Sequence, residues 1–217
     1  MSPQGPASSI VSAVSAHEFF RDLLLQAVQN QRQSVQPETE AYLVNLLAGF
    51  LESEALFQKD ESGRVEARPL AFLLKDALEQ EGAQRLALLR KLGDTSLFVA
   101  GFFSESISNG PVGPDYYAAM GERAYDALGG AVARHSRSVG DLAGKKSVFE
   151  ELAARFKQVA NVLEEVSERT ASSTNAGLLR LYDKFLRTGS MRLSVLLRGQ
   201  GMLVPVAYAA PRGRMPQ

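Results

Sequence analysis

Residues 147–166 read SVFEELAARFKQVANVLEEV and carry the clearest periodic pattern in the chain. Ser147 and Glu150 have the three-residue spacing of a capping box, which predicts a helix that begins at Ser147. Apolar side chains then recur at intervals of three and four residues, so they share one face of that helix. These side chains are Phe149, Leu152, Phe156, Val159, Leu163 and Val166.

The same spacing recurs over most of the 217 residues. No segment alternates polar and apolar side chains with a period of two, as a half-buried strand would. We therefore predict an all-α protein, a compact bundle of about seven or eight helices with no sheet. Besides the helix at Ser147, the predicted helices cover residues 15–33, 37–57, 69–92, 94–103, 115–135 and 175–198, with a bend near Gly82 and a division at Gly189 and Ser190.

Glycine, proline and charged residues mark the expected breaks between these helices. Gly93 followed by Asp94 is typical of a helix end and a new N-cap. Residues 59–67 (KDESGRVEA) and 140–146 (GDLAGKK) are expected to be loops, and residues 108–114 (SNGPVGP) form the strongest cluster of breakers. Either Thr174 or Asn175 can cap the last helical stretch.

The two ends of the chain differ in composition from its middle. Residues 1–14 are rich in Ser, Pro, Gly and Ala, and residues 199–217 are rich in Gly and Pro, so both are expected to be flexible segments. Residues 15–198 are expected to form a single helical domain, which could divide into lobes 15–92 and 94–198. A chain of this length buries about 70 percent of the surface of its unfolded form, which suffices for a core without metals or disulfides.

The residue types that most often carry catalysis or bind metals are scarce. The chain has no cysteine, which removes thiol nucleophiles, disulfides and thiolate metal sites. Its two histidines, His17 and His135, have no metal-ligand partner at helical spacing, and the Glu-x-x-His signature of di-iron bundles is absent. Residues 140–147 (GDLAGKKS) only superficially resemble a phosphate-binding loop, because three rather than four residues separate the glycines. We therefore predict no catalytic residues, no metal site and no cofactor.

Aromatic residues gather around the breaker cluster. Six of the chain's 11 Phe and 6 Tyr lie within 28 positions: Phe98, Phe102, Phe103, Tyr116, Tyr117 and Tyr125. Aromatic side chains dominate both cores and interfaces, so these residues could be core, or a groove for a protein partner that involves Tyr116 and Tyr117. They could also line a small-molecule pocket, because an apolar lining with a few polar groups is typical of such sites. The residues of that predicted pocket are Phe98, Phe102, Asp115, Tyr117, Glu122 and Arg123.

The equal numbers of basic and acidic residues, 24 each, conceal an uneven distribution. Residues 1–66 contain 4 basic and 9 acidic side chains, whereas residues 134–217 contain 14 basic and 7 acidic ones. In the last helical stretch the basic side chains lie opposite an apolar face, which gives a basic amphipathic helix. Such a helix could bind an acidic protein, an anionic membrane or nucleic acid, or it could present a solvated face while its apolar side packs on the bundle. The basic residues are Arg180, Lys184, Arg187 and Arg198.

These features together favour a non-enzymatic, cytoplasmic adaptor or regulatory protein that acts through contacts with a protein partner. One alternative is a helical enzyme, or a carrier of a lipid or metabolite, with an apolar pocket near residues 98–125. Another is a protein that binds nucleic acid or an anionic membrane through the basic last helix. The longest apolar run, residues 97–103, is far shorter than the roughly 20 residues that a membrane span needs. The 17 Arg against 7 Lys, together with much Ala and Leu, indicate a GC-rich bacterial genome.

Overall fold

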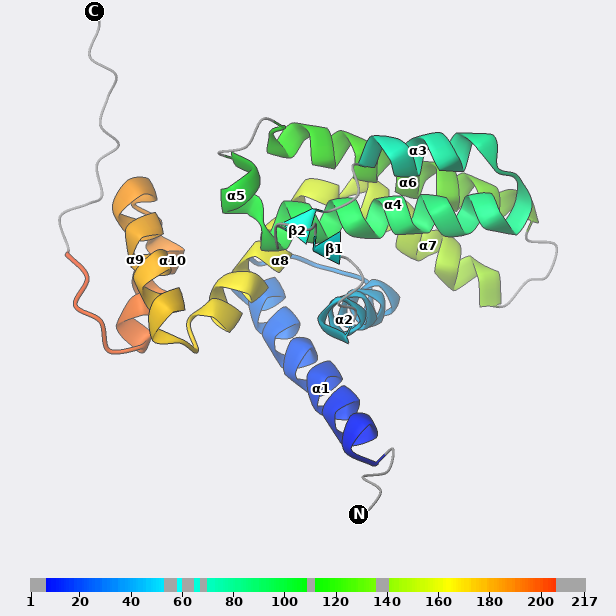
Figure 1. The fold of residues 1–217 in the computed structure, drawn as a ribbon. Coiled ribbons are helices and arrows are strands. Elements are labelled where there is room, and N and C mark those ends of the chain that lie inside the picture. The colour runs from blue at the N-terminus through cyan, green and yellow to red at the C-terminus, as the bar shows by residue number, and fades with distance from the viewer. Residues whose placement is uncertain are drawn as a thin grey trace, which may run out of the picture. The chain divides into compact units, whose positions relative to one another are not determined.

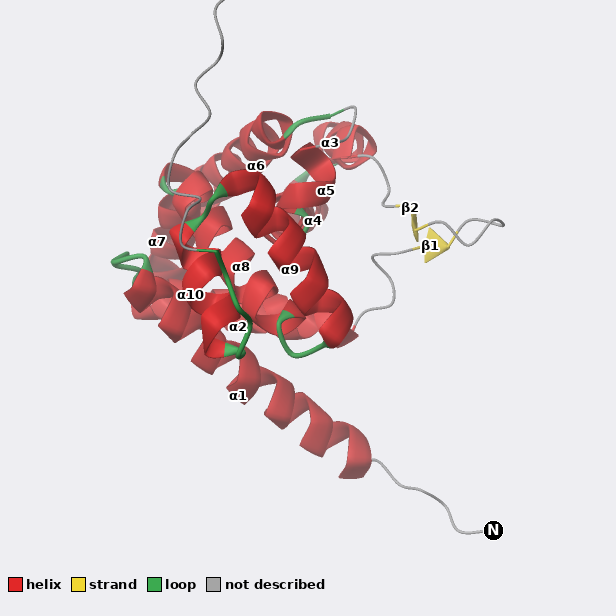
Figure 2. Ribbon diagram, turned by 90° about the vertical axis from the view of Figure 1, so that its left-hand side faces the viewer, coloured by secondary structure: helices red, strands yellow, loops and turns green. Residues whose placement is uncertain are grey.

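The computed structural model describes residues 7–52, 58–59, 65–66, 70–108, 112–135 and 141–205. These residues form ten helices and one pair of two-residue strands, and Figure 2 shows that helices account for almost all of them. The all-α prediction is confirmed, with more helices than the seven or eight expected. The one addition is an antiparallel pairing of β1 (Gln58–Lys59) with β2 (Val65–Glu66), at the place where the sequence predicted only a loop.

The chain divides into two compact units, unit 1 (residues 1–164) and unit 2 (residues 165–217). The boundary falls inside helix α8 (Phe156–Ala171). The sequence predicted a single domain with a possible division into lobes 15–92 and 94–198. Each unit has its own buried core of apolar side chains.

The N-terminal end of the chain differs from its expected boundary. Helix α1 (Ala7–Asn30) begins well before the predicted start at Ser15, so part of the segment 1–14 that was expected to be flexible is helical. Of the expected tail, the structure describes residues up to Pro205, and these follow the last helix without regular structure. Residues 1–6 and 206–217 lie outside the described part of the chain.

The described part of unit 1 contains seven helices and the beginning of α8. After α1 they are α2 (Pro37–Glu52), α3 (Leu70–Glu79), α4 (Gly82–Phe102), α5 (Ser104–Ser108), α6 (Pro114–His135) and α7 (Asp141–Ala154). Figure 1 shows α3, α4 and α6 lying alongside one another, and α4 packs against both α3 and α6. α6 packs in turn against α7, and α2 against both α1 and α7. α4 and α6 are therefore the central helices of this unit.

The core of unit 1 is closely packed because glycine occurs where α8 meets these central helices. A Cβ atom added at Gly101 of α4 would lie 2.5 Å from the Cβ atom of Leu163, and one added at Gly121 of α6 would clash with the ring of Phe156. Both glycines therefore permit a close approach of α8 to α4 and α6. The largest fully buried side chains of the unit are Leu24, Leu43, Leu47, Leu92, Leu97, Tyr125, Leu152, Phe156 and Leu163.

The predicted helix boundary at Gly93 and Asp94 is wrong, because α4 runs through both residues without a break. Gly93 is a packing residue: a Cβ atom there would lie 2.7 Å from Cε1 of Tyr125. Asp94 caps no helix, since its carboxylate accepts hydrogen bonds from the hydroxyls of Tyr42 and Tyr125. Gly93 and Asp94 are therefore explained by contacts with distant residues, although their types indicated a helix end when only neighbouring residues were considered.

The helix predicted to begin at Ser147 begins earlier. α7 starts at Asp141, so residues 141–146 of the expected loop are helical. Ser147 is not an N-cap, because its hydroxyl instead donates a hydrogen bond to the side chain of Gln36. The capping-box spacing at this point is therefore a coincidence of residue types inside a helix.

The same segment is divided by a local deviation at Arg155, where α7 ends and α8 begins one residue later. Helical hydrogen bonds continue across it: the Arg155 amide donates to the Glu151 carbonyl at 2.9 Å, and the Val159 amide donates to the Arg155 carbonyl at 2.9 Å. The uninterrupted apolar spacing of the segment thus corresponds to a helical run with one irregular residue.

Unit 2 comprises the end of α8, helix α9 (Asn175–Thr188) and helix α10 (Met191–Gly199). The hydroxyl of Thr174 caps α9 by accepting a hydrogen bond, at 3.1 Å, from the amide three residues later. Gly189, with a φ of 65°, ends α9, and Ser190 caps α10, so the predicted division is confirmed. The two helices share a core formed by Leu181, Phe185, Leu193, Leu197 and Val204.

Candidate functional site

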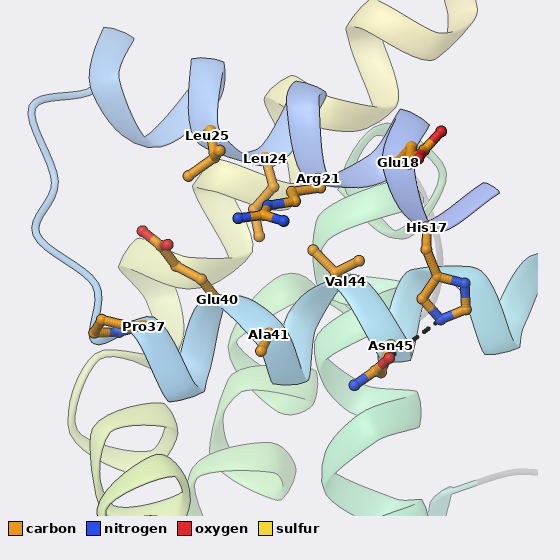
Figure 3. Close-up of a pocket in the computed structure, with 10 residues that line it drawn as sticks. All are labelled: His17, Glu18, Arg21, Leu24, Leu25, Pro37, Glu40, Ala41, Val44 and Asn45. Atoms are coloured by element: carbon orange, nitrogen blue, oxygen red, sulfur yellow. Dashed lines mark hydrogen bonds between the residues drawn. The ribbon is translucent and has the colours of Figure 1, made fainter. Parts of the chain in front are cut away.

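The candidate site is a groove between α1 and α2 with a volume of about 420 Å³. Figure 3 shows the two helices running along its sides, with the side chains that line it between them. Leu24 and Val44 form its buried apolar floor. The residues that line the groove are His17, Glu18, Arg21, Leu24 and Leu25 of α1, and Pro37, Glu40, Ala41, Val44 and Asn45 of α2.

Helical periodicity explains why these residues share one surface. On each helix the lining positions recur every three or four residues, which keeps their side chains on the side that faces the other helix. Pro37 occupies the first helical position of α2, where a missing amide costs little, and Glu38 and Glu40 lie near the positive end of the helix dipole. The local sequence therefore fixes where α2 starts and which of its residues turn toward α1.

Polar side chains form the walls of the groove. At one end, Nε2 of His17 and Oδ1 of Asn45 are hydrogen-bonded at 3.1 Å, which links the two helices (Figure 3). Arg21 and Glu40 extend into the space between the helices, the first from α1 and the second from α2. Within the described residues, the side chains of Arg21 and Glu40 make no hydrogen bond or ion pair, so both charges can pair with a bound molecule.

The loop between α1 and α2 is fastened by side chains from much later in the chain. Arg155 donates hydrogen bonds to the carbonyl of Ser34 and, at 2.8 Å, to the side-chain oxygen of Gln33. The amide of Gln36 donates to Oε2 of Glu151 at 3.2 Å. We name this set of contacts the loop clamp. It holds the connection between the two groove helices, so it helps to fix the width of the groove.

A second cavity, of about 440 Å³, lies between α4, α6 and α7. Charged side chains dominate its rim, among them Glu81, Arg85, Asp126 and Glu150. In the part of the chain that the structure describes, no three His, Cys, Asp or Glu side chains are grouped so that they could hold a metal ion. The carboxylates around this cavity therefore form no ligand set.

A buried polar cluster joins α2, α4 and α6. Oδ1 of Asp94 accepts a hydrogen bond from the hydroxyl of Tyr42 at 2.6 Å and another from the hydroxyl of Tyr125 at 2.8 Å. Nε of Arg90 donates to the Tyr42 hydroxyl at 3.2 Å and lies 3.5 Å from Oδ2 of Asp94. We name these four residues the Asp94 cluster.

Burial dominates the electrostatics of this cluster. It raises the pKa of the Asp94 carboxyl, although hydrogen bonds from Tyr42 and Tyr125 and the charge of Arg90 act in the opposite direction. Burial also raises the pKa of the Tyr42 and Tyr125 hydroxyls, and the neighbouring Asp94 charge adds to that rise. Each group has a partner within the cluster, and none lines either of the cavities described above. The hydrogen bonds of the cluster link α2, α4 and α6.

The aromatic residues of the pocket predicted near residues 98–125 pack into the protein. The ring of Phe98 is stacked on that of Phe102 at 4.8 Å between centroids and on that of Phe50 at 4.2 Å. Tyr117 packs against a buried cluster that includes Leu73 and Ala124. The structure therefore brings Phe98 and Phe102 together but places Tyr117 in a different group.

The polar residues predicted for that pocket lie apart from these aromatic groups. Asp115 is an exposed residue whose Oδ1 lies 3.0 Å from Nζ of Lys157. Glu122 is half-buried and Arg123 is exposed on α6. None of the six residues predicted for the pocket lines either of the two cavities.

Among the predicted partner-binding residues, Lys184 is paired with a carboxylate of unit 2. Its Nζ lies 2.7 Å from Oε1 of Glu168, and its side chain is only 15% exposed, so it neutralises a buried carboxylate instead of presenting its charge to solvent. The predicted contact residues that do lie on the surface are Arg180, Arg187, Arg198 and Tyr116, whereas Tyr117 is partly buried.

The groove was not predicted from the sequence. His17 and Asn45 are 28 positions apart, and nothing within either helix distinguishes Arg21 or Glu40 from residues of a solvated face. The one local signal is Ala41, a small residue on the lining side of α2.

No protein-family model matches the chain, and no curated protein or solved structure matches it either. No helix within the described ranges has the length and apolar character needed to cross a membrane. The fold and the groove therefore define its class: an all-α protein with an open groove between two helices.

Proposed function

We propose that the chain is a non-enzymatic helical adaptor, and that the groove between α1 and α2 receives an amphipathic helix of a protein partner. The observation that carries this proposal is the combination of an apolar floor, made by Leu24 and Val44, with walls that present the charges of Arg21 and Glu40. Amphipathic helices bind in grooves of this kind by inserting apolar side chains at helical spacing.

The wall charges would set the orientation of such a partner helix. Arg21 favours an acidic residue and Glu40 favours a basic one, and the two lie on opposite walls of the groove. Charges at the rim of an interface contribute mainly to specificity and association rate, while the buried apolar contacts contribute most of the affinity. A partner helix inserted in reverse would face like charges at both positions.

The location of the titratable groups with raised pKa values supports a binding function over a catalytic one. Groups whose pKa is shifted by burial are candidates for acid-base catalysis when they line a cleft. Here the hydroxyls of Tyr42 and Tyr125 donate hydrogen bonds to Asp94, and none of the three residues lines either of the cavities described above.

A second candidate function is the binding of a small apolar carboxylate in the same groove. The volume of about 420 Å³ falls in the range of roughly 300–1,000 Å³ for small-molecule sites. Arg21 would then pair with the ligand carboxylate. A thermal-shift screen of fatty acids and aromatic carboxylates tests this function, because a bound ligand raises the melting temperature by mass action.

Site-specific photo-crosslinking tests the adaptor function. A photoreactive phenylalanine analogue at Ala41 lies in the groove, whereas the same analogue at Ala71 lies on an exposed helical surface outside it. We expect crosslinks from position 41, and not from position 71, to an amphipathic helical segment of one protein. Arg21→Glu should weaken that crosslink at least severalfold, and Arg123→Glu, an exposed control, should not. Identical products from both positions, or none from position 41, would refute the proposal.

A further inference from the structure

Unit 2 carries an unusual concentration of exposed aliphatic side chains. Among the described residues ten large hydrophobic side chains are exposed, and half of them lie between positions 179 and 203. A concentration of exposed apolar surface marks a region that contacts another molecule, whereas isolated exposed apolar residues need no explanation. The five residues are Leu179, Leu186, Met191, Val195 and Leu203, with exposed fractions of 63%, 36%, 72%, 64% and 95%.

Helical spacing places the first four of these residues in stripes. Leu179 and Leu186 are seven positions apart and so lie along one side of α9. Met191 and Val195 are four positions apart on α10, and Arg198 continues their stripe three positions later. All are exposed, while the shared core of α9 and α10 is built from the other sides of the helices, so the stripes face outward.

The acidic residues of unit 2 are mostly neutralised inside it. Oε1 of Glu165 lies 3.0 Å from Nη2 of Arg169, and both atoms belong to α8. The buried Glu168 lies between two cations: Nζ of Lys184 is 2.7 Å from Oε1, and Nη2 of Arg192 is 2.9 Å from Oε2. Three basic residues thus neutralise the two buried carboxylates of this unit.

The basic residues of unit 2 outnumber its acidic ones. Residues 165–217 contain eight basic and three acidic residues, and after the buried pairs the only acidic side chain left is Asp183. Arg180 is exposed on α9 next to Leu179, and Arg198 is exposed in the stripe of α10. Aliphatic and cationic side chains therefore alternate on the same exposed helix surfaces.

We propose that unit 2 docks on an anionic lipid surface, into which the aliphatic stripes of α9 and α10 insert while Arg180 and Arg198 pair with lipid headgroups. Interfacial helices use this combination: apolar side chains reach the boundary of the acyl chains, and long cationic side chains stay at the headgroup level. This inference concerns a different unit from the groove and is independent of the adaptor function.

The composition of the surface favours lipid over a protein partner. Between residues 165 and 205, the exposed large apolar residues are Leu, Met and Val without an aromatic residue, whereas Trp and Tyr are enriched in protein interfaces and Leu and Val are under-represented there. The stripes lie on the outward sides of helices, and both cavities described above are in unit 1. A lipid boundary needs no complementary pocket, because its acyl chains adapt to the side chains that enter it.

Co-sedimentation of the full chain with vesicles tests the docking. We expect binding to vesicles of phosphatidylcholine with 30 percent phosphatidylserine, weaker binding at high salt, and little binding to phosphatidylcholine alone. Arg180→Glu and Arg198→Glu should each weaken binding about fivefold or more. Leu179→Ser with Val195→Ser should weaken it at least tenfold, whereas Leu78→Ser, at a side chain of unit 1 that is 67% exposed, should not.

Fluorescence gives a second readout, because the chain contains no tryptophan. A single tryptophan introduced as Val195→Trp should shift its emission to the blue on addition of the anionic vesicles and be quenched by brominated lipid, and Leu78→Trp should show neither effect.

Three outcomes would overturn the proposal. The first is the absence of sedimentation with anionic vesicles, and the second is equal binding to neutral ones. The third is self-association that Leu179→Ser with Val195→Ser abolishes, because a second copy of the chain would then cover this surface. Circular dichroism of each variant verifies that the helices persist, as expected for substitutions at exposed positions.

Discussion

Replacing Asp94 by alanine should destabilise unit 1 strongly, although the substitution removes a buried charge. Asp94 is the common acceptor for the Tyr42 and Tyr125 hydroxyls, at 2.6 and 2.8 Å. Tyr125 is fully buried, so without Asp94 its hydroxyl would have neither a protein partner nor water. Two polar groups would thus lose their acceptor at once.

The expected loss in the free energy of unfolding follows from these two hydrogen bonds. A hydrogen bond to a charged group contributes about 1.5–3 kcal/mol, so the loss of two costs about 3–6 kcal/mol. Alanine recovers about 0.5 kcal/mol through its higher helix propensity, and removal of a buried carboxylate recovers part of its desolvation cost. We therefore expect Asp94→Ala to lower the free energy of unfolding by about 3 kcal/mol at pH 7.

Urea denaturation followed by circular dichroism at 222 nm measures this loss. Asp126→Ala, at an exposed position of α6, is the matched control and should change stability by less than about 0.5 kcal/mol. Tyr125→Phe removes one hydroxyl together with its need for an acceptor, so it should cost less than Asp94→Ala. If the free energy of unfolding of Asp94→Ala is within about 1 kcal/mol of that of the unmodified chain, the hydrogen bonds of the Asp94 cluster do not stabilise the fold as proposed.

Two further predictions concern titration and unit 2. Burial raises the pKa of Asp94 in the folded state above the ordinary carboxyl pKa of 3.8. Between these two pKa values the folded protein binds more protons than the unfolded chain. The free energy of unfolding therefore falls as the pH rises through that window. Asp94→Asn should remove this slope from a plot of unfolding free energy against pH. An unchanged slope would show that another titratable group causes the pH dependence. Glu168→Ala leaves Lys184 and Arg192 without their carboxylate, so it should cost about 3 kcal/mol. Hydrogen exchange should then increase across residues 165–205 and not in unit 1, with Arg180→Ala as an exposed control; uniform exchange throughout would show that the two units unfold together.

Features that depend on neighbouring residues could be predicted from the sequence. Thr174, Gly189 and Ser190 act within one turn of their own positions, through a side-chain cap or a left-handed backbone. The sequence predicted Thr174 as one of two possible caps, and it predicted a division at Gly189 and Ser190. The helical spacing of apolar residues likewise identified most of the helices, because burial of one face is what stabilises a helix in a folded protein.

Features that depend on distant contacts could not be predicted in this way. Gly93 and Asp94 have the residue types of a helix boundary, but Tyr42 and Tyr125, 52 and 31 positions from Asp94, determine their role. Lys184 has the spacing of a surface cation, but Glu168 of another helix takes up its charge. The groove is formed by the pairing of α1 with α2, and no pattern within a single helix encodes the space between two helices.

The loop clamp has a consequence for the order in which the protein acquires its binding surface. The two groove helices lie near the start of the chain, but Glu151 and Arg155, which fasten their connecting loop, are 115 to 122 positions further on. During synthesis, α1 and α2 leave the ribosome long before these residues exist. The groove therefore reaches its final geometry only after most of unit 1 has been translated.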